Sequence, residues 1–175
     1  MTQTDDSVTV QVSRPPTAAV QAAVVAGVAG QPVFPVAHEL AGRSLSAGFA
    51  VGLSGNPDAR PGRAIEAHLR VSRSSRQPGP LTGHGECRIV LGLEPIEAIR
   101  AATTYYVPGL RVVSLTEPIT IAAVAAGKAA PVDIDRAAVV LRETGCQVEW
   151  ISGGVSDTSL SELVDAAWAV LSSMP

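Results

Sequence analysis

Residues 85–100 read GECRIVLGLEPIEAIR, and this stretch decides the fold of the chain. The apolar run Cys87–Leu91 predicts a short buried strand. Pro95 is preorganised for the first position of a helix, and Glu94 and Glu97 place carboxylates where the helix dipole favours negative charge. The stretch therefore predicts a strand, a tight turn and a helix, which is the repeating unit of parallel sheets.

The same unit recurs along the rest of the chain. Apolar runs and alternating patterns predict strands at residues 20–27, 49–53, 64–72, 87–91, 111–115 and 147–151. Helical spacing of apolar residues predicts helices at residues 32–47, 95–105, 134–144 and from 159 onward. Strands that alternate with helices predict an α/β fold, with a single doubly wound, mostly parallel sheet and helices on both faces. Residues 1–17 are polar and predict a mobile leader, so the α/β domain is expected at residues 18–175.

Sequence signals mark the ends of the later helices. Asp133 is the expected N-cap of one helix, and Ser159 with Glu162 predicts a capping box for the last helix. The apolar stripe of this last helix includes Trp168. The spacing of the stripe predicts that it packs on the sheet and that Trp168 is largely buried.

Composition excludes several classes of protein. The 175 residues suffice for one compact domain, and 46% of them are hydrophobic. The net charge of −3 provides no general attraction for nucleic acid or for an anionic membrane. Cys87 and Cys146 lie in separate apolar runs, which indicates buried thiols in a reducing compartment. The N-terminal segment is acidic and contains no basic stretch of the kind that begins a secretory signal. These features together lead us to expect a cytoplasmic protein without a membrane span.

A glycine-rich turn, GVAGQP at residues 27–32, lies where the first strand gives way to a helix. In this position backbone N–H groups and a helix N-terminus can bind a phosphate. Pro32 has no N–H group and its ring crowds the approach. We therefore interpret the turn as a tight structural turn, with an anion-binding loop as the alternative.

The segment ARPGRAIEAHLR, residues 59–70, carries two arginines in a loop and His68 and Arg70 on the polar face of an alternating strand. Such side chains could bind a carboxylate or a phosphate, or could form an ordinary solvated surface. The alternation indicates a half-solvated strand near a sheet edge or facing a partner.

Three other features of the sequence are weak candidates for a catalytic or metal site. The sequence GLSGN, residues 52–56, lacks the last glycine of a nucleophile elbow. His84 and Glu86 have no third metal ligand nearby, and we interpret His84 as a loop residue. His38, beside an apolar helix stripe, is expected to be partly buried. We predict no catalytic residue and no metal site in this chain.

The glycine-rich turn, the arginine segment and the stretch around Pro95 follow one another in an order that resembles the gamma-type domain of pyruvate and other 2-oxoacid:ferredoxin oxidoreductases. The resemblance is greatest to the indolepyruvate oxidoreductase beta subunit. The segment GLEPIEAIR at residues 92–100 is the most specific part of the resemblance. Gly27, Gly30 and Gln31 match a G-x-G-G-Q-G signature in which Ala29 and Pro32 replace glycines. In a second family segment, Q-R-G-G-S-V-x-S-H-V-R, the matching residues are Arg60, Gly62, His68 and Arg70, while Pro61 replaces a glycine and Arg63 a small residue.

The resemblance implies an accessory subunit that has no oxidoreductase activity alone. It implies no cofactor in this chain, with thiamine diphosphate, Mg²⁺ and iron–sulfur clusters in partner subunits that oxidatively decarboxylate a 2-oxoacid. It leaves open which 2-oxoacid is used and whether the chain also associates with copies of itself. The expected ligand- or partner-facing residues are Gly27, Gly30, Gln31, Arg60, Gly62, Arg63 and His68.

Two other functions remain compatible with the sequence. The chain could be a diverged non-catalytic binding or scaffolding protein that keeps the fold, or a stand-alone Rossmann-like reductase. A scaffolding protein would purify without oxidoreductase subunits, whereas a reductase would bind a dinucleotide.

Overall fold

The computed structural model describes residues 20–55, 57, 60, 62–83, 85–119, 125–127 and 130–173. The predicted leader, residues 1–17, lies outside this part of the chain. The strands described are β1 (Val20–Val28), β2 (Ala50–Gly55), β3 (Ala64–Ser72), β4 (Cys87–Gly92), β5 (Arg111–Leu115) and β6 (Gln147–Ile151). The helices described are α1 (Val33–Ser46), α2 (Pro95–Thr104), α4 (Ile134–Glu143) and α5 (Asp157–Ser172).

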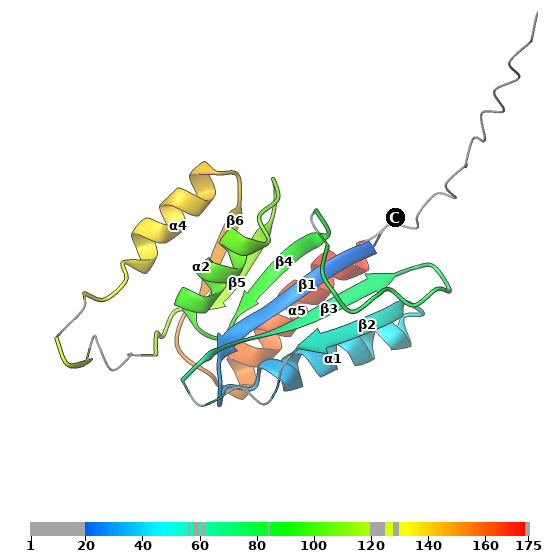
Figure 1. The fold of residues 1–175 in the computed structure, drawn as a ribbon, viewed down its shortest axis with the longest axis horizontal. Helices are drawn as coiled ribbons and strands as arrows, with labels where there is room; N and C mark the ends of the chain where they lie inside the picture. Colours follow the sequence, from blue (N-terminus) through cyan, green and yellow to red (C-terminus); the bar gives the residue numbers. More distant parts are fainter. Residues whose placement is uncertain are drawn as a thin grey trace, which may run out of the picture.

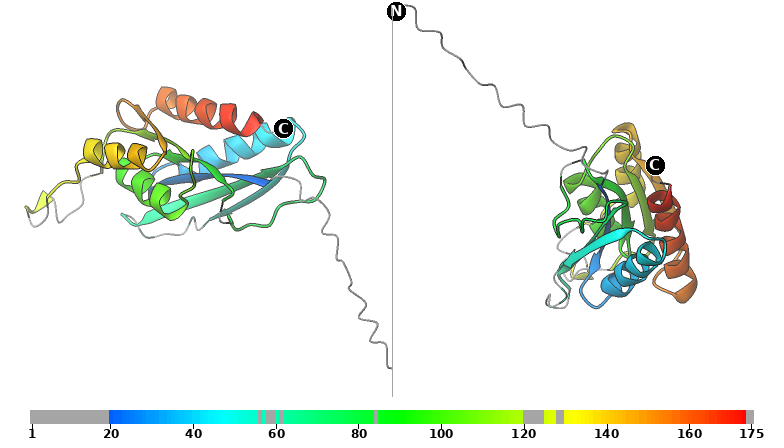
Figure 2. Two further views of the ribbon diagram at one scale, coloured as in Figure 1. Left: turned by 90° about the horizontal axis from the view of Figure 1, so that it is seen from above. Right: turned by 90° about the vertical axis from the view of Figure 1, so that its right-hand side faces the viewer.

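The six strands form one sheet in the order β2-β3-β1-β4-β5-β6 (Figure 1). Strands β1, β4, β5 and β6 are parallel neighbours, and β3 runs antiparallel to both β1 and β2. Helices α1 and α5 cover one face of the sheet and α2 and α4 cover the other (Figure 2). The predicted doubly wound, mostly parallel sheet with helices on both faces is confirmed.

The stretch that decides the fold forms β4 and α2 at the centre of the sheet. Ile89, Val90 and Leu91 are fully buried, with successive side chains in the cores on opposite faces. Glu94 is the N-cap of α2, because its Oε2 accepts a hydrogen bond of 2.8 Å from the backbone N–H of Glu97.

The cap of α5 differs from the prediction. The capping box consists of Ser156 and Ser159, and the helix begins at Asp157, about one turn before the predicted start. The Ser159 hydroxyl reaches back to the backbone N–H of Ser156 at 2.9 Å, so it takes the place of the expected Glu162 carboxylate. The Asp133 cap of α4 was predicted correctly, since its Oδ1 accepts from the N–H of Arg136 at 2.9 Å.

Two side chains are more exposed than expected. Trp168 is only partly buried and meets Phe49 edge to face, with ring centroids 6.4 Å apart, at the rim of the core between α1 and α5. His38 is exposed on α1. The central positions of the stripe on α5, Leu163 and Ala167, are fully buried as predicted.

Strand β3 alternates as predicted and lies near the edge of the sheet, next to the edge strand β2. Its buried side chains, Ile65, Ala67, Leu69 and Val71, face α1 and α5. Its polar face points to the side of α2, and the segment between β3 and β4 contacts this face through side-chain hydrogen bonds. None of the helices described is long and apolar enough to cross a membrane.

Alanine substitutions at two glycines should change the stability of the protein in opposite directions. A Cβ at Gly92 would collide with the Ser114 hydroxyl and the Ala98 methyl group, whereas a Cβ at Gly42, on the exposed side of α1, would contact nothing within 4 Å. We expect Gly92→Ala to lower the free energy of unfolding by about 2–3 kcal/mol through overpacking. As the control, Gly42→Ala should raise it by about 0.5–1 kcal/mol because alanine favours helix. Urea denaturation measures both, and equal effects of the two substitutions would contradict this packing.

Candidate functional site

The glycine-rich turn and the arginine loop lie side by side at the carboxyl ends of β1 and β2. The backbone N–H of Ala29 donates to the carbonyl of Arg63 at 2.8 Å, and Val28 is paired with Ala64. Arg60 and Arg63 of the arginine loop are both exposed. Gly62 has a φ of +77°, in the left-handed region that glycine adopts without strain. The two predicted loops therefore meet at one edge of the sheet.

This edge is the topological switch point of the fold. The chain leaves β1 through α1 towards β2 on one side, and it leaves β4 through α2 towards β5 on the other. Open α/β sheets form a crevice between such diverging strands, and ligands commonly bind there. A ligand-binding site is therefore expected between the end of β1 and the end of β4.

The side chain of Gln31 occupies this crevice. Its Oε1 accepts from the N–H of Val28 at 2.8 Å, and its Nε2 donates to the carbonyl of Leu93 at 2.9 Å. A Cβ at Gly27 would lie 2.7 Å from Gln31 Oε1 and 2.8 Å from Val33 Cγ2. Gly27 is therefore required because the Gln31 amide packs directly against the backbone of β1.

The turn uses most of its own backbone donors. Besides the bonds of Val28 and Ala29, the N–H of Gln31 donates to the Val28 carbonyl at 2.9 Å, and the N–H of Val33 donates to the Gln31 carbonyl at 2.9 Å. Pro32 has no N–H to offer. These contacts support a tight structural turn over a loop whose N–H groups bind an anion.

Glu94 adds a buried carboxylate to the same edge. Its side chain caps α2 through Oε2, and its Oε1 accepts from the N–H of Ile119 at 3.4 Å. Burial raises the pKa of the Glu94 carboxyl above its ordinary value. Burial also raises the pKa of Glu97, which pairs with Arg100 at 2.9 Å. The sequence predicts Glu94 only as a residue that opens a helix. A glutamate where a serine or aspartate usually caps a helix was the available signal.

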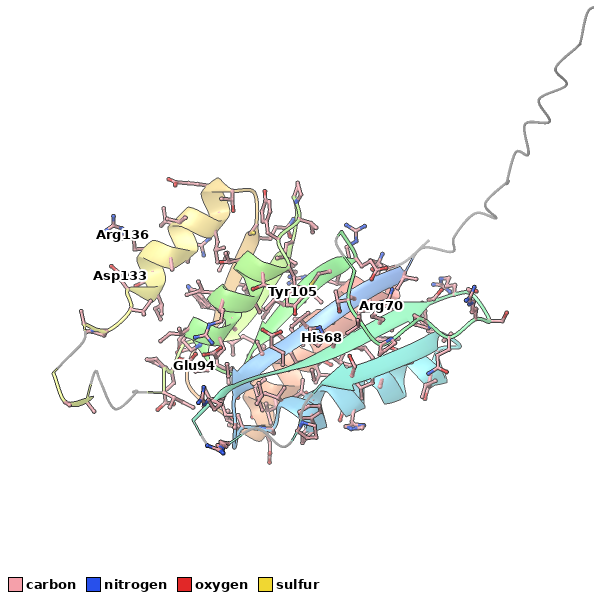
Figure 3. The ribbon with its side chains drawn as sticks, viewed as in Figure 1. His68, Arg70, Glu94, Tyr105, Asp133 and Arg136 are labelled. Carbon is pink, nitrogen blue, oxygen red and sulfur yellow. The ribbon has the colours of Figure 1, made fainter. Side chains whose placement is uncertain are left out.

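The structure separates His68 from the other predicted site residues. His68 lies opposite Val24, four residues along β3 from Ala64, and this corresponds to about 13 Å at the rise of a strand. It points instead toward Tyr105 at the end of α2 (Figure 3), with ring centroids 5.4 Å apart. The loop residues Gly27, Gly30, Gln31, Arg60, Gly62 and Arg63 thus form one group, and His68 belongs to another.

The second group is a hydrogen-bonded network on the polar face of β3. The Nδ1 of His68 lies 3.1 Å from the Thr82 hydroxyl, and its Nε2 lies 3.5 Å from Glu66. The Tyr105 hydroxyl donates to Glu66 at 3.0 Å. Burial lowers the pKa of His68, and this effect is larger than the opposing attraction of Glu66. Burial raises the pKa of Tyr105, and the Glu66 carboxylate adds to this shift.

The cysteines have the properties of buried thiols. Both Cys87 and Cys146 are buried and reduced. Burial raises the pKa of the Cys87 thiol to about 12, so this sulfur is protonated at neutral pH and is a poor metal ligand. In the described part of the chain, no group of three or more His, Cys, Asp or Glu residues could hold a metal ion.

Solved structures resemble this fold although the sequences differ. A pyruvate oxidoreductase subunit, PORC from Thermotoga maritima, superposes with a TM-score of 0.54 at 16% identity, covering 89% of this chain and 79% of that chain. The 2-oxoglutarate:ferredoxin oxidoreductase from Magnetococcus marinus has a TM-score of 0.51 at 14% identity, covering 87% of this chain and 28% of that chain. The gamma subunit of a keto/oxoacid ferredoxin oxidoreductase from Geobacter sulfurreducens has a TM-score of 0.43 at 16% identity, covering 89% and 86% of the two chains.

No protein-family model matches the sequence, and no curated protein matches it. At these identities the likeness to the first two solved structures concerns the fold alone. The chain has the α/β fold found in 2-oxoacid oxidoreductases. The closer relation to the indolepyruvate enzyme stays a prediction.

Removing the Gln31 amide should loosen the crevice. In Gln31→Ala the N–H of Val28 and the carbonyl of Leu93 lose their partner, which should lower the free energy of unfolding by about 1–3 kcal/mol. Gln77→Ala, at an exposed position, should change it by less than about 0.5 kcal/mol. If urea denaturation gives the same small change for both variants, the Gln31 bridge does not hold the two turns together.

His68 should make stability depend on pH. Because its pKa is lowered on folding, its contribution is fully present above its ordinary pKa of about 6.5 and is lost as the pH falls through the lower, folded value. Between about pH 7.5 and pH 5 the wild type should therefore lose more stability than His68→Gln. Urea denaturation across this range measures the difference, and parallel pH profiles for the two proteins would refute a buried neutral imidazole.

Proposed function

We propose that this chain is an accessory, gamma-type subunit of a 2-oxoacid:ferredoxin oxidoreductase and that it has no catalytic activity alone. Thiamine diphosphate, Mg²⁺ and the iron–sulfur clusters would be bound by partner subunits. Within this class we propose the indolepyruvate oxidoreductase beta subunit as the nearest relative, with indolepyruvate or pyruvate as the substrate of the assembled enzyme.

The observation that carries the proposal is the fold shared with the pyruvate oxidoreductase subunit over 89% of this chain. The placement of the three sequence motifs supports it. The glycine-rich turn joins β1 to α1, the arginine segment joins β2 to β3, and the GLEPIEAIR segment joins β4 to α2. The motifs thus lie at or beside one edge of the sheet, although they are separated in the sequence.

The carboxyl-end loops are the surface that we propose for a partner subunit. Arg60 and Arg63 are exposed there, beside a turn whose backbone donors are largely used internally. Recognition through this surface would depend on shape and on the charge of the arginines more than on backbone N–H groups. Arg60 is the arginine of this loop that matches the family segment, so we assign it the main contact.

A non-catalytic binding or scaffolding protein is the second candidate. The closed turn around Gln31 favours it, because the crevice where α/β proteins usually bind a ligand is filled by the chain's own side chain. The same feature argues against a stand-alone dinucleotide-dependent reductase.

Affinity purification from the native host, followed by mass spectrometry, separates the two candidates. An accessory subunit should bring with it subunits that bind thiamine diphosphate and iron–sulfur clusters, in constant proportion and with 2-oxoacid oxidation in the eluate. Recovery of the chain alone or as a self-assembly, under anaerobic conditions that keep clusters intact, would contradict the proposal and favour the scaffolding protein.

Arg60→Ala tests the partner-facing surface. We expect it to reduce recovery of the partner subunits or the activity of the complex while the melting temperature of the isolated chain changes by no more than about 2 °C, because Arg60 is exposed. Arg136→Ala removes the same charge from α4, beside β6, and should leave both properties unchanged. An Arg60 variant that assembles normally, or one that unfolds while the complex tolerates it, would refute the assignment.

A further inference from the structure

A cavity with several polar lining residues lies at the end of the sheet opposite the carboxyl-end loops. It has a volume of about 340 Å³ and lies between the start of β1, the end of β3 and the segment that follows β3. Its polar lining comes from Arg70, Ser72, Ser74, Arg76 and Gln77. No carboxylate is among its described lining residues. Two arginines therefore line the cavity, of which Arg70 is paired with the Glu86 carboxylate behind the wall and Arg76 is not.

Arg70 is held in a fixed position in this wall. Its side chain is 12% exposed, and its Nη2 donates to Glu86 Oε1 at 2.7 Å. Its Nη1 donates to the carbonyl of Gly79 at 2.5 Å. Glu86 is itself fixed, because its other oxygen accepts from the N–H of Gly83 at 2.7 Å. Figure 3 places Arg70 on β3 beyond His68, away from the Tyr105 network.

One donor of this fixed guanidinium has no acceptor. The Nε–H of Arg70 is buried and has no hydrogen-bond partner among the described residues. A buried donor of a charged group is costly to leave unpaired, and the residue that carries this donor lines the cavity. An oxygen that accepts from this N–H would complete the hydrogen bonding of Arg70.

The other polar groups of the cavity supply donors as well. The hydroxyls of Ser72 and Ser74 each accept one backbone N–H bond, from Ser74 and Arg76 respectively, so their own hydrogens remain free to donate. Ser72 is 2% exposed. The guanidinium of Arg76 is exposed and makes no ion pair in the part of the chain that the structure describes. Hydroxyl and guanidinium donors from β3 and from the segment that follows it thus line one volume, and Arg76 adds a positive charge that no described carboxylate compensates.

We propose that this cavity binds a small oxyanion, the phosphate or carboxylate group of a metabolite. The anion accepts from Arg70 Nε and from the Ser72 hydroxyl, and Arg76 supplies the charge at the opening. The volume lies in the range of small-molecule pockets and exceeds the needs of an inorganic ion alone. The site is independent of the function proposed above, because it uses none of the residues of the carboxyl-end loops.

The Nε–H resonance of Arg70 in a ¹H–¹⁵N spectrum tests the site directly. Arg70→Lys identifies the resonance by removing it while retaining a charge that can pair with Glu86. Titration of the full chain with inorganic phosphate or with pyruvate, at constant ionic strength, should shift this resonance to saturation with a Kd of about 1 mM or tighter. Saturation with phosphate alone assigns the ligand to phosphorylated metabolites, and saturation with pyruvate alone assigns it to carboxylates.

Two variants of equal charge provide the control. Arg76→Ala should weaken the binding by about 5-fold or more, because it removes the cation at the opening. Arg88→Ala removes an exposed arginine of β4 that does not line the cavity, and it should leave the Kd unchanged. The proposal is overturned if neither anion gives a saturable shift, or if Arg76→Ala and Arg88→Ala affect the titration equally.

Discussion

The structure depends on one side chain, the Gln31 amide, which bridges the ends of β1 and β4. These are the two central strands, and the chain leaves them in opposite directions. The amide adds to the hydrogen bond of 2.9 Å that the N–H of Leu93 donates to the Ala26 carbonyl. The amide donates to Leu93 and accepts from Val28, and it fits only because Gly27 has no Cβ. The glycine that suggests a phosphate-binding loop in the sequence therefore serves a packing contact. A glycine-rich turn after a strand predicts close approach of some group, and here the group belongs to the protein itself.

Most of the fold could be predicted because its signals are local. Pro95 and Asp133 mark helix starts through their own backbone and side-chain chemistry, and β5 and β6 were predicted to the residue. Predictions from the sequence were wrong where the outcome depended on a competing local hydrogen-bond partner or on tertiary packing. Ser156 and Ser159 form a capping box in which both side chains are hydroxyls. The usual capping-box pattern has a carboxylate or amide at the second position, so it does not predict this pair. The position of β3 between β1 and β2, with its polar face under the following segment, follows from strand order and not from its own alternation.

The candidate site could be predicted only in part, for a related reason. The meeting of the two loops follows from topology, since a loop after β1 and a loop after β2 lie at the same edge of the sheet when both strands point the same way. His68 belongs to a strand and not to a loop, so the rise of the strand carries it to a separate network with Tyr105. Arg70, two residues further along β3, extends the polar face to the opposite end of the sheet. The pattern of the segment identified polar residues correctly, but one extended strand cannot bring all of them to one place.

The edges of the sheet limit how partners can approach. At β6, the N–H of Gln147 donates to Leu110 on the side of β5, so the backbone groups of Val148 face the open edge. Arg142 from α4 donates to the Val148 carbonyl at 3.0 Å and thereby occupies an acceptor that an added strand would need. Covering an edge with a charged side chain is a common defence against strand addition. A strand added at β6 would therefore find this acceptor already occupied, so the α4 side chain protects that edge of the sheet.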